Sequence, residues 1–119
     1  MLRQPPAIEG YGAGGFRVEG ERFEGSILIL EDVAGPWTGV SLAGLTPEDF
    51  APVLEAGLAV VEFVLLGAGA ATAPPPKAVR EALQASGLGL EVMDTPEACR
   101  LYNILAKDGR RVAAALIAV

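Results

Sequence analysis

Residues 60–66 read Val-Val-Glu-Phe-Val-Leu-Leu, and the run Gly-Ala-Gly follows directly at 67–69. This stretch is rich in β-branched and apolar residues and has no helical period, which predicts a buried strand. Further elements are expected to alternate downstream: an amphipathic helix at 77–86, a strand at 88–93, a helix at 95–107 and an apolar strand at 111–119. Parallel strands need helical crossovers of this kind, so the alternation indicates an α/β sheet.

Upstream of residue 60, short alternating segments separated by turn residues predict a β-rich region. The expected strands are residues 7–11, 15–18, 26–30 and 37–42, with a chain break at Gly35-Pro36. A helix is expected to begin at Thr46 and to be short or bent, because Pro52 falls within it. The predicted fold class is α/β, with three layers and a mixed central β-sheet. About three helices flank this sheet, the N-terminal part is antiparallel and β-rich, and residues 1–119 form a single domain.

The helix at 95–107 is expected to begin in the same way, since Thr95-Pro96-Glu97 repeats the pattern of residues 46–48. Its inward face is predicted from apolar spacing. The residues expected to point inward are Ala98, Leu101, Ile104 and Leu105.

Composition excludes several classes of function. The formal net charge is −6, which argues against a nucleic-acid partner because phosphate binding needs clustered cations. No apolar run reaches the roughly 20 residues of a membrane span, and residues 1–6 lack the apolar core of a secretory leader. The single cysteine favours a reducing compartment. We therefore expect a soluble cytoplasmic protein.

Catalytic and metal-binding residues are hard to find in this chain. It contains no histidine and one thiol, Cys99, which argues against zinc and against a nucleophile activated by imidazole. Cys99 is expected to be a packing or surface residue, although the start of a helix nearby would lower the pKa of its thiol. We predict no catalytic residue, no metal and no cofactor.

A dinucleotide site is the sharpest alternative. Gly67 and Gly69 follow a strand, and Asp94 ends the next strand at about the spacing of a Rossmann fingerprint. However, Thr72 stands where a third glycine or alanine is expected, and the prolines at 74–76 separate the glycine turn from the helix start that would face a phosphate. A turn at the end of a strand explains the glycines better.

The richest polar cluster lies near the C-terminus. With the glycine turn, it supplies the candidate ligand or partner surface: Gly67, Gly69, Asp94, Thr95, Arg100, Tyr102, Asn103, Arg110 and Arg111. The spacing of Arg100, Asn103 and Lys107 places them on one helix face, and cations here would suit an acidic partner or an anion. The alternative is structural, since cations are favourable near a helix C-terminus.

Several segments in this order resemble a known family: residues 8–16 (Ile-Glu-Gly-Tyr-Gly-Ala-Gly-Gly-Phe), 65–69, 93–98, 102–105 and 108–116. Together they resemble the small uncharacterised-domain family that includes mitochondrial complex I assembly factor 3 and the adipogenesis-associated domain protein. The resemblance implies a three-layer α/β fold around a mixed sheet, no established catalytic residues and, for the mitochondrial member, work alongside another assembly protein. The chain resembles a bacterial-type member.

Three hypotheses follow. The leading one is a non-enzymatic protein-interaction module that assists the assembly of a respiratory complex, with protein partners still to be identified. The competing one is a small-molecule or anion-binding domain, conceivably an enzyme, centred on the Gly67–Gly69 turn and the region of Asp94 and Arg110. The third is self-association, because hydrophobic residues make up 51% of a small chain.

Overall fold

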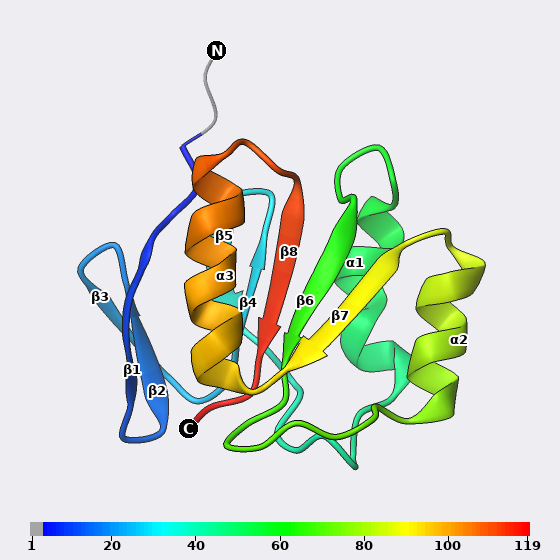
Figure 1. Ribbon diagram of the computed structural model, residues 1–119, viewed down its shortest axis with the longest axis horizontal. Coiled ribbons are helices and arrows are strands. Elements are labelled where there is room, and N and C mark those ends of the chain that lie inside the picture. Colours follow the sequence, from blue (N-terminus) through cyan, green and yellow to red (C-terminus); the bar gives the residue numbers. More distant parts are fainter. Residues whose placement is uncertain (1–3) are drawn as a thin grey trace.

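The computed structural model describes residues 4–119, so the expectation about residues 1–6 falls partly on Met1–Arg3, outside the described residues. The larger sheet has five strands: β5 (Val33–Pro36), β4 (Ile27–Leu30), β8 (Val112–Leu116), β6 (Phe63–Gly67) and β7 (Gly89–Met93), in that spatial order. Neighbours β5, β4 and β8 pair antiparallel, whereas β8, β6 and β7 pair parallel. The mixed sheet and the α/β class are confirmed (Figure 1).

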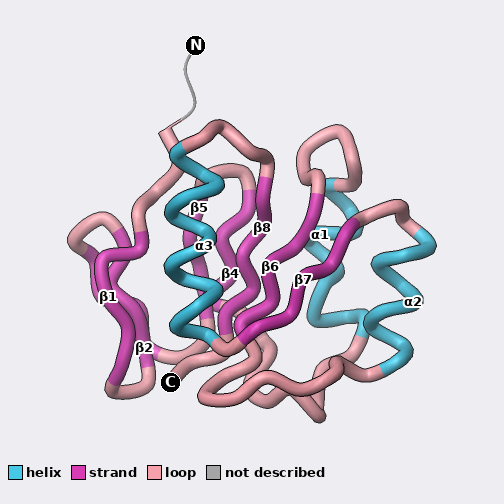
Figure 2. Tube along the Cα trace, in the orientation of Figure 1, coloured by secondary structure: helices cyan, strands magenta, loops and turns pink. Residues whose placement is uncertain are grey.

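The first three strands form a separate antiparallel sheet: β1 (Ile8–Gly12), β2 (Gly15–Val18) and β3 (Glu21–Glu24). This sheet does not extend the five-stranded one. Its buried side chains Phe16 and Val18 join the core that includes helix α3 (Thr95–Lys107). The β-rich start of the chain therefore covers the side of α3, as Figure 2 shows.

Residues 37–42 were expected to be a strand, and this expectation is wrong. The chain reverses earlier, at Glu31 and Asp32, whose positive φ values of 50° and 64° suit a two-residue hairpin turn. Gly35 and Pro36 consequently lie within the returning strand β5 and do not break it. Beyond this strand the Trp37 side chain enters the core and its Nε1 donates a hydrogen bond to the Asp49 carbonyl at 2.7 Å.

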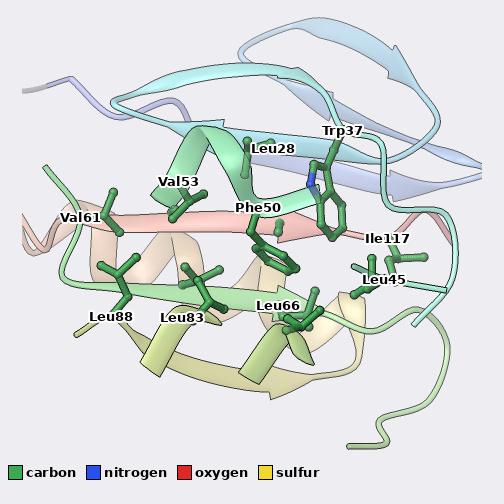
Figure 3. Close-up of a cluster of buried hydrophobic side chains, with 14 residues drawn as sticks. Leu28, Trp37, Leu45, Phe50, Val53, Val61, Leu66, Leu83, Leu88 and Ile117 are labelled. Carbon is green, nitrogen blue, oxygen red and sulfur yellow. The ribbon is translucent and has the colours of Figure 1, made fainter. Parts of the chain in front are cut away.

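Helices cover both faces of the five-stranded sheet. A 3-10 turn (Pro47–Phe50), α1 (Ala51–Ala56) and α2 (Lys77–Ala85) lie on one face, and α3 lies on the other. Two hydrophobic cores therefore form, one on each face of the sheet, and alternate residues of an inner strand point into them. In β6, Val64 and Leu66 point into the first core, on the side of α1 and α2, and Leu65 points into the second core, on the side of α3. Figure 3 shows the first core, in which Phe50 and Trp37 meet edge to face at 5.5 Å. The expected bend near Pro52 is the change from the 3-10 turn to α1.

The inward face of α3 differs from the expectation. Ile104 is 44% exposed, whereas Tyr102 is 1% exposed and Cys99 is buried. Helix α3 is covered by the sheet below it and by the three-stranded sheet beside it. The buried face is consequently centred one position away from the stripe that apolar spacing alone predicts.

Candidate functional site

A groove runs between strand β1 and helix α3, with a volume of about 400 Å³. We call it the β1–α3 groove, and its lining residues are Ile8, Glu9, Gly10, Tyr11, Asp94, Pro96, Glu97, Cys99, Arg100 and Asn103. Strand and helix lie side by side in Figure 1. The groove therefore brings together two segments more than 80 residues apart in the sequence.

At one end of the groove, the side-chain amide of Asn103 forms the hydrogen bonds that a neighbouring strand would form. Asn103 Nδ2 donates to the Ile8 carbonyl at 2.8 Å, and Asn103 Oδ1 accepts from the Ile8 N–H at 2.9 Å. These are the two bonds that a neighbouring strand would make to one residue of a strand edge. Asn103 thus ties β1 to α3 and occupies part of the β1 edge.

At the other end, Asp94 is the N-cap of α3. Its Oδ1 accepts a hydrogen bond from the Glu97 N–H at 2.8 Å. Helix α3 begins at Thr95 as expected, but its N-cap is Asp94 and not Thr95. Arg100 lies on the exposed side of the groove and forms an ion pair with Glu97. Its guanidinium lowers the pKa of the Glu97 carboxyl, mainly through this side-chain hydrogen bond.

Thr95 is fully buried and joins three segments of the chain. Its Oγ1 accepts from the Gly69 N–H at 2.9 Å and donates to the Ile117 carbonyl at 2.7 Å. Its own N–H donates to the Gly69 carbonyl at 2.8 Å. This hydroxyl holds the glycine turn and the segment after β8 against the start of α3, and it lies beneath the surface.

The Gly67–Gly69 turn is built into the same junction. The Ala68 and Gly69 N–H groups donate to the Met93 carbonyl and the Thr95 hydroxyl, so neither is directed at a ligand. A Cβ on Gly67 would lie only 2.9 Å from Thr95 Oγ1. Position 67 is therefore a glycine because Thr95 packs closely against it. The geometry favours the structural interpretation of this turn over the dinucleotide one.

Arg110 and Arg111 lie beyond the opposite end of α3 from Asp94. Thirteen helical residues separate the two ends by about 20 Å, so the structure does not bring Asp94 and Arg110 into one site. Arg110 and Arg111 both form ion pairs with Glu62, at 3.5 and 4.0 Å. The pKa of Glu62 is lowered, first by the hydrogen bond from the Arg111 N–H and then by these two guanidinium charges.

Further contacts of these arginines are also internal. The Arg110 guanidinium lies 5.4 Å from the centre of the Phe63 ring, and Arg111 Nη1 donates to the carbonyls of Leu58 and Ala59. Tyr102 lies in the core rather than on a surface. Of the predicted site residues, Asp94, Arg100 and Asn103 share the β1–α3 groove. Sequence reasoning missed Glu9, Gly10 and Tyr11 as partners of these three, although residues 8–16 carried the family resemblance.

Cys99 lies at the base of the groove but is only 3% exposed. Burial raises the pKa of its thiol to about 12, opposite in direction to the lowering expected from the helix start. Within residues 4–119, no group of three or more His, Cys, Asp or Glu side chains is arranged to hold a metal ion. The groove therefore offers a shaped polar surface rather than a reactive thiol.

We expect the Cys99 thiol to resist a disulfide-exchange reagent at pH 8 in native buffer and to react fully in denaturant. Because the pKa in the folded state exceeds that of the unfolded chain, the folded state keeps the proton longer. The contribution of Cys99 to the free energy of unfolding should then fall as the pH rises from about 9 toward 12, by up to ~1.4 kcal/mol per pH unit. Thiol titration checks the reactivity, and urea melts at several pH values check the stability. The variant Cys99→Ala should lack the contribution of the thiol to the pH dependence. Rapid stoichiometric labelling of the native protein would contradict it.

No helix in the described part of the chain is long and apolar enough to cross a membrane. A family model described as a protein of unknown function (DUF498/DUF598) matches residues 8–117. An uncharacterized protein of Rhodobacter capsulatus is 42% identical, covering 92% of this chain and 82% of that protein. Human NADH dehydrogenase (ubiquinone) 1 alpha subcomplex assembly factor 3 is 33% identical, over 92% of this chain and 59% of the human protein. The chain thus spans less than two thirds of that factor.

Solved structures agree with the fold. A crystal structure described as an outer membrane protein from Bartonella henselae has a TM-score of 0.89 and 32% identity, covering 100% of this chain and 99% of that one. The solution structure of a Rhodopseudomonas palustris protein has a TM-score of 0.82 and 35% identity, covering 100% and 89%. These matches confirm the family resemblance drawn from the sequence: the chain belongs to the DUF498/DUF598 family.

Proposed function

We propose that this chain is a protein-interaction module that assists the assembly of a respiratory NADH dehydrogenase. The observation that carries the proposal is the 33% identity to human assembly factor 3, which extends over 92% of the chain. The matched segment makes up 59% of the human factor and most of this chain. This extent supports the proposal that the assembly role belongs to the α/β fold itself.

The arrangement of polar groups supports binding over chemistry. Thr95, Arg110 and Arg111 make internal contacts that hold elements together. The β1–α3 groove is open and polar, a form that suits a protein partner. The single cysteine, buried as a thiol, supports a reducing compartment, and we propose that the module acts in the cytoplasm.

The test uses the relative from Rhodobacter capsulatus. We would delete the gene for that relative, express this chain in its place, and measure assembled NADH dehydrogenase in the membranes by native electrophoresis and NADH oxidation. We expect the deletion to lower the amount of assembled enzyme and this chain to restore it. We also expect tagged chain to copurify with subunits of the enzyme before assembly is complete.

A folding-deficient variant provides the matched control. In Gly15→Ala the new Cβ would lie 2.3 Å from the Phe23 carbonyl oxygen, which forces β2 and β3 apart, so this variant should restore nothing. Normal enzyme levels after the deletion would refute the proposal. So would a stably expressed wild-type chain that neither restores assembly nor copurifies with a subunit.

A further inference from the structure

We propose that the β1–α3 groove binds an extended, basic segment of a partner protein, which adds as a strand to the free edge of β1. This inference rests on the proposed function, because it names the surface and the class of partner that an interaction module would use. It is argued from the strand edge, the space beside it and the charge of its walls.

Strand β1 lies at the edge of its sheet, paired with β2 on one side. The other edge faces α3, where the Asn103 amide already pairs with the Ile8 backbone as a strand would. Past this residue the groove is lined by Gly10 and Tyr11 from the same strand. A strand edge beside an open groove is the arrangement that peptide addition requires.

Gly10 adds no side chain to the groove, and a Cβ built there would have no atom within 4 Å. The pairing of β1 with β2 shifts register between Ile8 and Gly10, and glycine in a strand is typical of such a bulge. Gly10 therefore belongs to the irregular part of β1 and leaves open space beside Tyr11.

The groove fits a short segment. The part of α3 that lines the groove, from Pro96 to Asn103, is about 10 Å long, which equals the length of about three residues of an extended chain. Tyr11 is 49% exposed and offers an aromatic face to alternate side chains of the incoming strand. Backbone pairing and one aromatic contact would thus fix the register of a tripeptide core.

The charge of the walls selects a basic partner. Three carboxylates (Glu9, Asp94 and Glu97) and one guanidinium (Arg100) line the groove, and Arg100 is paired with Glu97. Glu9 and Asp94 each accept one backbone N–H, from Gly20 at 2.6 Å and from Glu97 at 2.8 Å. Among the described residues neither forms an ion pair, so the residues that line the groove carry a net negative charge. Lys or Arg side chains of the partner complement them.

The experiment titrates the ¹⁵N-labelled full chain with three capped pentapeptides: Lys-Val-Lys-Val-Lys, its Glu-Val-Glu-Val-Glu counterpart, and the Lys peptide N-methylated at alternate residues. We expect the Lys peptide to shift the amide signals of Gly10, Tyr11 and Arg100. The Glu peptide should not bind, and N-methylation should abolish binding because it removes the donors of the pairing edge. Raising the salt from about 0.05 to about 0.3 M should weaken binding.

Two charge variants keep the local structure. Glu9→Gln retains the acceptor for Gly20, and Asp94→Asn retains the helix cap, so each removes charge alone. Each should weaken the Lys peptide about threefold to fivefold. Glu55→Gln, on the exposed side of α1 across the sheet, should change nothing.

The inference fails if the Lys peptide leaves the β1 amides unshifted up to millimolar concentration, or if the Glu or N-methylated peptide binds as well. Its failure is separable from that of the proposed function. Groove variants that restore NADH dehydrogenase fully would refute the groove and leave the assembly role standing. A wild-type chain that does not restore assembled NADH dehydrogenase would refute the assembly role. The peptide titration would still test whether the groove binds a basic segment.

Discussion

Phe16→Ala is expected to lower the free energy of unfolding by about 4 kcal/mol, which a chemical melt followed by circular dichroism would measure. Phe16 is fully buried on β2, in the core that also holds Ile8 and Tyr102. Removing the ring leaves a cavity between the three-stranded sheet and α3. The loss would show that this small sheet is a structural part of the core.

Tyr11→Ala is the matched control for this variant. Tyr11 stands directly opposite Phe16 in the β1–β2 pair, yet it is 49% exposed. Its removal should cost less than about 1 kcal/mol. If Phe16→Ala cost no more than Tyr11→Ala, the first three strands would contribute little to the stability of the fold.

Thr95→Val is expected to destabilise the protein by about 3 kcal/mol despite its near-identical shape. The change removes the hydroxyl that serves both the Gly69 N–H and the Ile117 carbonyl, and it leaves two buried polar groups without a partner. Urea melts measure the loss. Proton exchange at the Gly69 amide should also accelerate relative to amides at the centre of β6.

Thr95→Ser separates the hydroxyl from the methyl group. It keeps both hydrogen bonds and loses one methyl, so its cost should be about 1 kcal/mol. Equal losses in the Ser and Val variants would mean that packing, rather than the hydroxyl, holds the junction.

The second half of the fold could be predicted from sequence because its signals are local. The apolar stretch at 60–66, Gly87 after α2 and the apolar end of the chain each mark an element that the structure contains. The position of β5 could not be predicted in this way. Its hairpin turn uses Glu31 and Asp32 at positive φ, where sequence signals would lead one to expect glycine or asparagine.

The groove was predictable in part. The spacing of Arg100 and Asn103 predicts a shared face of one helix, and Asp94 is the N-cap of the same helix. Their partner strand lies some 95 residues away from Asn103, and nothing local in the sequence indicates that Ile8 meets its amide. Conversely, Arg110 looks close to Asp94 along the chain, but α3 extends between them and holds them at its opposite ends.

The position of β8 has a consequence for synthesis on the ribosome. This strand follows every other described strand in the chain, yet it lies in the middle of the sheet and joins β4 to β6. Until residues 112–116 leave the exit tunnel, the β4–β5 hairpin and the β6–α2–β7 unit have no shared partner and expose apolar edges. Closure of the sheet therefore waits until β8 has been synthesised, and a nascent chain stalled before residue 112 is expected to recruit chaperones.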